Sequence, residues 1–127
     1  MKNILIVDDS SAVQKLLDQF LQRKGFSTRL AEDGFKALLC MKEKVPDLII
    51  TDIIMDGMDG LTLIREVRSQ YPDLPIIAIS GGRLALSVNF ESRAAKDGAN
   101  EFMEKPVKLD DLFNSILQLL DRSNLAE

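Results

Sequence analysis

The sequence has 127 residues, of which 46% are hydrophobic and 28% charged, and its formal net charge is −4 at pH 7. This length and balance predict one globular domain over residues 1–127 with no second domain, and they argue against a disordered chain or a membrane protein. The acidic net charge disfavours direct binding to nucleic acid. Histidine is absent, which excludes the commonest general base and the usual zinc ligand.

Short apolar runs alternate with helical patterns along the sequence. We predict strands at residues 4–7, 28–31, 48–51, 75–79 and 100–103, and helices at residues 11–24, 34–44, 61–70, 84–97 and 109–120. The runs at 4–7 and 48–51 are continuous and rich in β-branched residues, which is typical of strands buried on both faces of a parallel sheet. Right-handed crossovers through the helices then predict an α/β fold, a doubly wound five-stranded parallel sheet in a three-layer sandwich.

Two local features bear on location and redox chemistry. The apolar run at residues 4–7 is too short for a signal-peptide core or a membrane span, so we expect a cytoplasmic protein with no membrane partner. Cys40 is the only cysteine and lies inside a helical apolar pattern. We expect it to be a small buried hydrophobe.

Polar residues follow four of the predicted strands. Asp8 and Asp9 follow the first, Asp52 the third and Ser80 the fourth, and Lys105 lies shortly after the fifth. Ligands bind at the carboxyl ends of the strands in open parallel sheets, so we expect these side chains to form one site. A single strand-end carboxylate can simply cap the next helix, but three together repel one another unless a cation or a proton offsets their charge, and a bound cation is the simpler explanation.

The residue types around this edge favour magnesium and phosphate chemistry. Carboxylate oxygens without nearby His or Cys favour Mg²⁺, or Mn²⁺, and Mg²⁺ in proteins commonly binds phosphate oxygens as well. Ser80 can donate a hydrogen bond to a phosphoryl oxygen, and Lys105 can pair with one. Asp52 can act as a nucleophile, because aspartate carboxylates form aspartyl-phosphates.

Five short motifs carry a family resemblance over essentially the whole chain. They are Ile-Val-Asp-Asp-Ser at 6–10, Asp-Leu-Ile-Ile-Thr-Asp at 47–52, Met-Asp-Gly at 58–60, Ile-Ser-Gly at 79–81 and Glu-Lys-Pro at 104–106. Together they resemble the receiver domains of two-component response regulators. The resemblance implies a CheY-like, flavodoxin-like sheet with strand order 2-1-3-4-5. It also implies a phosphoacceptor signalling domain rather than an enzyme.

The resemblance assigns roles to the acidic residues. Asp52 resembles the phosphoacceptor, which would receive a phosphoryl group from a histidine kinase or a His-containing phosphotransfer protein. Asp8 and Asp9 resemble the pair that holds Mg²⁺ together with Asp52, and the backbone carbonyl of Ile54 resembles a further metal ligand.

The resemblance also implies a conformational switch. Ser80 matches the switch hydroxyl and Lys105 the phosphate partner, and the bond from Lys105 to Pro106 is expected to be cis. Phe102 matches the aromatic switch, although a plain core phenylalanine is the simpler interpretation. A downstream effector protein would then bind the face formed by helix 84–97, strand 100–103 and helix 109–120, and a homodimer through the same face is left open.

The sequence departs from the family pattern at several positions. Asp56 stands where the family commonly has proline, and Ile54 places an apolar side chain near the path of attacking water. The segment from Ser80 to Lys105 is longer than usual, 105 − 80 = 25 positions. We interpret this as a shifted start of helix 84–97 rather than as a special docking patch.

Two other functions compete with a stand-alone, phosphorylated receiver. A receiver-like adaptor would bind its partners without phosphorylation. A phosphatase of the haloacid dehalogenase type would also use a strand-end Asp nucleophile with Mg²⁺, but that motif needs a second Asp where this chain has Ile54. The adaptor is therefore the stronger alternative.

Overall fold

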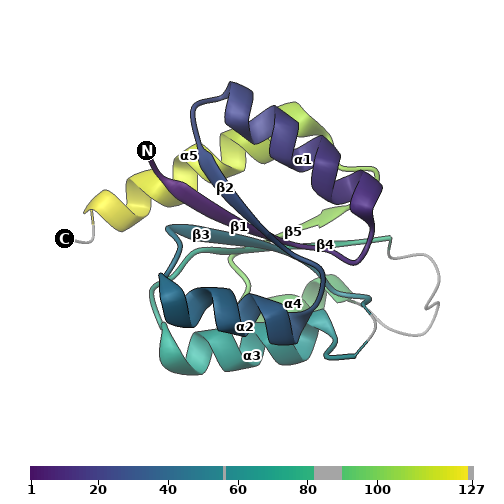
Figure 1. The fold of residues 1–127 in the computed structure, drawn as a ribbon. Helices are drawn as coiled ribbons and strands as arrows, with labels where there is room; N and C mark the ends of the chain where they lie inside the picture. The colour runs from purple at the N-terminus through teal and green to yellow at the C-terminus, as the bar shows by residue number, and fades with distance from the viewer. Residues whose placement is uncertain (56, 82–89, 126–127) are drawn as a thin grey trace.

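The computed structural model describes residues 1–55, 57–81 and 90–125. Strands and helices alternate along this part of the chain (Figure 1). The elements are β1 (Asn3–Val7), α1 (Ser11–Arg23), β2 (Ser27–Ala31), α2 (Gly34–Glu43), β3 (Leu48–Asp52), α3 (Gly60–Gln70), β4 (Ile76–Ser80), α4 (Phe90–Asp97), β5 (Glu101–Glu104) and α5 (Leu109–Leu125).

The five strands form one parallel sheet in the order β2-β1-β3-β4-β5. Helices α1 and α5 cover one face of the sheet, and α2, α3 and α4 cover the other (Figure 1). The predicted three-layer sandwich and strand order are confirmed. Because all strands run in the same direction, their carboxyl ends meet along one edge of the sheet.

Each face of the sheet has its own hydrophobic core, because successive side chains of a strand point to opposite faces. On β1, Ile4 and Ile6 pack with residues of α1 and α5, whereas Leu5 and Val7 pack with residues of α2, α3 and α4. All four side chains are fully buried. Burial on both faces explains why this strand is a continuous apolar run in the sequence.

Side chains that begin the helices fix the loops at the carboxyl edge. Ser10, Asp33 and Asp59 accept hydrogen bonds from backbone N–H groups in the first turns of α1, α2 and α3, respectively. Such caps satisfy donors that have no partner within the helix. Thus the Asp of the Met-Asp-Gly motif at 58–60 starts α3 directly after the loop that follows Asp52.

Several sequence predictions of local structure need correction. Helix α5 continues to Leu125 rather than ending at residue 120. Strand β5 is shifted by one residue from the predicted 100–103, since it runs from Glu101 to Glu104. Cys40 is only partly buried, because α2 directs mainly Ala37 and Met41 into the core. Helix α4 begins at Phe90, and the earlier part of predicted helix 84–97, with the proposed shift of its start, lies outside the described residues.

Among the described residues, no helix has both the length and the hydrophobicity that a membrane crossing requires.

Candidate metal centre

Three carboxylates meet at the carboxyl edge of the sheet. Asp8 directly follows β1, Asp9 comes next, and Asp52 is the last residue of β3. One carboxylate oxygen of each residue lies within 4.8 Å of one oxygen of each of the others. Asp8 is 0% exposed and Asp52 is 3% exposed, whereas Asp9 faces solvent. The site is therefore a buried acidic pair with one carboxylate at its open side.

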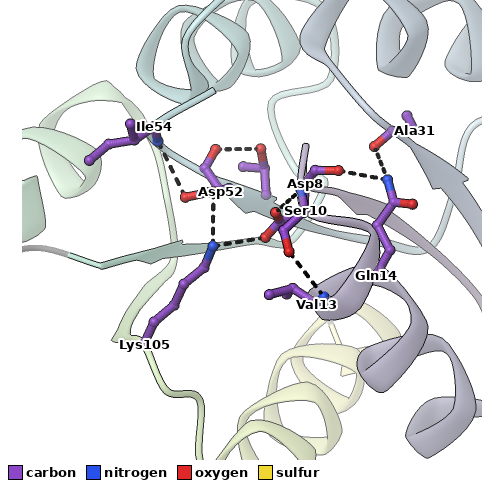
Figure 2. Close-up of polar contacts among 9 residues, drawn as sticks. Asp8, Ser10, Val13, Gln14, Ala31, Asp52, Ile54 and Lys105 are labelled. Carbon is purple, nitrogen blue, oxygen red and sulfur yellow. Dashed lines mark hydrogen bonds and ion pairs between the residues drawn. The ribbon is translucent and has the colours of Figure 1, made fainter. Parts of the chain in front are cut away.

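Lys105 supplies the positive charge at this edge (Figure 2). Its Nζ donates a hydrogen bond of 2.9 Å to Oδ2 of Asp52 and lies 3.1 Å from Oδ2 of Asp8. Its backbone N–H donates to the carbonyl oxygen of Ser80 at 2.8 Å, and its peptide bond to Pro106 is cis. One lysine thus bridges the carboxylate that follows β1 and the carboxylate at the end of β3.

The two oxygens of Asp8 have different environments. Oδ1 accepts a hydrogen bond of 2.8 Å from the backbone N–H of Ser10. Among the described residues, the buried Oδ2 has no hydrogen-bond partner, and its charge is offset by the ion pair with Nζ of Lys105 at 3.1 Å. A buried carboxylate oxygen without a hydrogen bond is costly. Together with two other hard oxygen donors, it fits a site for Mg²⁺ or Mn²⁺.

Burial and charge shift the pKa of two groups in this centre. Burial raises the pKa of Asp52, and the negative charge of Asp8 adds to the effect, while Lys105 and the N–H of Ile54 oppose it. For Lys105, burial lowers the pKa, but the interactions with Asp52 and Asp8 outweigh burial and raise it. The lysine therefore remains charged, and the ionised form of Asp52 is disfavoured without a further cation.

The loop after Asp52 is held by backbone contacts. Oδ1 of Asp52 accepts a hydrogen bond of 3.2 Å from the N–H of Ile54, whose side chain is 43% exposed. The N–H of Gly60 donates to the carbonyl oxygen of Ile53 at 2.7 Å. These contacts place the Ile54 backbone beside the phosphoacceptor candidate, and metal binding by its carbonyl stays a prediction.

The two switch candidates occupy different places. Ser80 is fully buried at the end of β4, one residue after Ile79, which pairs with Asp52 across the sheet. Phe102 lies two residues before the end of β5, packs partly against the core of the α2–α4 side, and lines a hollow of about 210 Å³ beside Ala95 and Ala99. Phe102 therefore lies by the core and the hollow, and Ser80 by the phosphoacceptor candidate. The switch roles of both residues stay predictions.

Gln14 contacts this edge, and the sequence did not predict it. Its Nε2 donates hydrogen bonds to the carbonyl oxygens of Asp8, at 2.6 Å, and Ala31, at 3.0 Å (Figure 2). In the sequence, Gln14 is only one polar position of an amphipathic helix. Its contact with β2 becomes visible only when the strands are assembled.

Known proteins resemble this chain in both sequence and structure. The family model of the response regulator receiver domain matches residues 4–117. Response regulator MprA of Mycobacterium sp. (strain KMS) is 35% identical over 124 residues, which are 98% of this chain and 53% of that protein. The chain therefore spans about half the length of the curated relatives it matches.

Two solved structures have the same architecture. A receiver domain protein from Clostridium thermocellum superimposes with a TM-score of 0.91 at 27% identity, over 100% of both chains. The receiver domain of NtrX from Brucella abortus gives a TM-score of 0.84 at 35% identity, over 93% of this chain and 98% of that one. These matches confirm the resemblance inferred from the five motifs, and they establish that the chain belongs to the response regulator receiver domain family.

Proposed function

We propose that this chain is a phosphorylation-dependent switch that accepts a phosphoryl group on Asp52 from a phosphohistidine of a histidine kinase or phosphotransfer protein. One observation carries the proposal: Asp52 is almost fully buried, yet its carboxylate lies against a lysine and close to two other carboxylates. A purely structural ion pair would not need the additional acids. A site that binds a metal ion and accepts a phosphoryl group needs them as metal ligands.

The metal would be held by the carboxylates of Asp8, Asp9 and Asp52, with the backbone carbonyl of Ile54 as a further ligand. When bound, Mg²⁺ or Mn²⁺ offsets negative charge on the transferring phosphoryl group. The buried Oδ2 of Asp8 supports this assignment, because within the described part of the chain it has no hydrogen bond and shares the charge of Lys105 with Asp52.

In the proposed transfer, a carboxylate oxygen of Asp52 attacks phosphorus in line with the leaving imidazole nitrogen. The new P–O bond forms as the P–N bond breaks, and the electron pair stays with the imidazole of the donor. Lys105 pairs with a phosphoryl oxygen, and Ser80 donates a hydrogen bond to another. The product is an acyl phosphate on Asp52.

The switch would follow from these new contacts. Ser80 moves toward the phosphoryl group, and Phe102 turns into the space that is released, which changes the face of α4, β5 and α5. The hollow beside Phe102 supports this choice of face for an effector protein. Action as a stand-alone receiver and a cytoplasmic location stay predictions, and a homodimer stays open.

Mass spectrometry tests the proposal directly. Incubation with a small-molecule phosphodonor and Mg²⁺ should add about 80 Da, the mass of one phosphoryl group. The gain should disappear with EDTA and in Asp52→Asn, but persist in the control Asp59→Asn, which changes an exposed helix cap. No gain with any donor would overturn the proposal and favour the phosphorylation-independent adaptor.

A further inference from the structure

We infer that Gln14 is a positioning residue for the metal centre: its side-chain amide fixes the backbone that carries Asp8 and Asp9. This inference rests on the proposed function, because it assigns Gln14 a role in metal binding at the same site. Gln14 lies in the first turns of α1, near the loop that joins β1 to this helix.

Both protons of the Gln14 amide are used. Nε2 donates to the carbonyl oxygens of Asp8, the residue after β1, and Ala31, the last residue of the neighbouring β2. Two carbonyl acceptors require the nitrogen rather than the oxygen of the amide at this position. The side chain is partly buried, so these bonds are shielded from competing water.

The contact holds Asp8 from both sides. The N–H of Asp8 donates to the carbonyl oxygen of Ala31 at 3.1 Å, and the carbonyl of Asp8 accepts from Gln14. The pairing between β1 and β2 ends with Val7 and Ala31, one residue before Asp8. Gln14 thereby extends the fixed backbone one residue beyond the strand.

This extension matters because the carbonyl of Asp8 belongs to the peptide group that precedes Asp9. Fixing that peptide plane holds N and Cα of Asp9, and the N–H of Ser10 on the other side is held by Asp8, so together these bonds restrict the direction in which the exposed Asp9 carboxylate leaves the backbone. The carboxylate of Asp8 is already held by the N–H of Ser10. Gln14 therefore acts mainly on the relation of Asp9 to the two buried carboxylates. Groups that orient metal ligands typically change metal affinity by 10–100-fold when they are replaced.

The test compares Gln14→Met, which keeps the length of the side chain but removes both donors, with Gln19→Met on the exposed surface of α1. Mg²⁺ affinity is measured by titration calorimetry on the complete chain, and stability is measured separately by urea unfolding without metal. We expect the dissociation constant for Mg²⁺ to rise about tenfold in Gln14→Met and to stay unchanged in Gln19→Met.

The affinity measurement separates positioning from a structural role. If Gln14→Met lowers stability but binds Mg²⁺ as tightly as the wild type, the inference is overturned while the proposed function stands. If the wild type itself takes up no Mg²⁺, both are overturned. Should Gln14→Met not fold, Gln14→Asn replaces it: this amide is one methylene shorter and cannot reach both carbonyls, so unchanged affinity in that variant would equally overturn the inference.

Discussion

Gly60 lies directly against the backbone of Asp52 and Ile53, and replacing it with alanine would push a Cβ atom into this contact. A Cβ atom on Gly60 would lie 2.0 Å from the carbonyl oxygen of Asp52 and 2.5 Å from Cα of Ile53. Ordinary contact begins near 3.4 Å, so the two segments would have to separate by about 3.4 − 2.0 = 1.4 Å. Hydrogen bonds hold both segments in place, since the N–H of Gly60 donates to the carbonyl oxygen of Ile53, and the N–H of Ile53 donates to the carbonyl oxygen of Ile79.

The expected cost follows from this clash. Overpacking costs about 1–3 kcal/mol, and a clash with backbone belongs at the upper end, while the better helix propensity of alanine recovers up to about 1 kcal/mol. The net loss is about 2 kcal/mol. With an unfolding entropy of about 2.1 cal/mol/K per residue, a chain of 127 residues should then melt about 7 °C lower.

Thermal unfolding followed by far-UV circular dichroism measures this loss, with Gly81→Ala as the matched control. A Cβ on Gly81 would meet no atom of the described residues within 4 Å, so its substitution should leave the melting temperature nearly unchanged. Equal melting temperatures for the two variants would refute the reasoning, because the loop after Asp52 would then be free to move away.

The metal centre and the end of α3 give three more predictions. In EDTA, the stability of Asp52→Asn relative to the wild type, measured by urea unfolding, should rise as pH increases from 3.8, the ordinary pKa of an aspartate, through the raised pKa of Asp52. The reason is that only the wild type has to ionise a buried carboxyl group over this range. Parallel curves of stability against pH would contradict this prediction. Mg²⁺ at ten times its dissociation constant should raise the free energy of unfolding by about 1.4 kcal/mol, measured by thermal shift, and Asp9→Asn should lose most of this gain. Arg68 donates four hydrogen bonds to backbone carbonyls, so Arg68→Met should cost about 2 kcal/mol in urea unfolding. Arg65→Met, which removes an exposed ion pair, should cost less than about 1 kcal/mol, and equal losses would show that the Arg68 bonds are not structural.

The sequence predicted the elements whose signal is local. The central strands β1 and β3 are continuous apolar runs because both of their faces are buried, and such runs are visible without coordinates. The end of α5 was wrong because residues beyond 120 lack a strong apolar stripe, yet the helix continues to Leu125. The prediction that Cys40 is buried was wrong, because hydrophobic periodicity identifies the apolar face of a helix but not how deeply each residue of that face is buried.

The candidate site could be anticipated only in part. The rule that ligands bind at strand ends brought Asp8, Asp9, Asp52 and Lys105 to one edge, and the structure places their side chains together. The contact of Gln14 with Ala31 could not be anticipated, because it depends on how α1 sits over the end of β2. Contacts between elements require the assembled geometry, whereas strand-end residues require only the order of the elements.

The acidic centre sets stability against function. Burial, and to a smaller extent the charge of Asp8, raises the pKa of Asp52, and Lys105 offsets only part of this cost of ionising the folded protein. The two hydrophobic cores that flank β1 and β3 offset this cost. A cation bound among the three carboxylates would recover the remaining penalty as binding free energy. Relief of this cost therefore contributes to the affinity that we propose, and Asp52→Asn should stabilise the metal-free protein while abolishing phosphorylation.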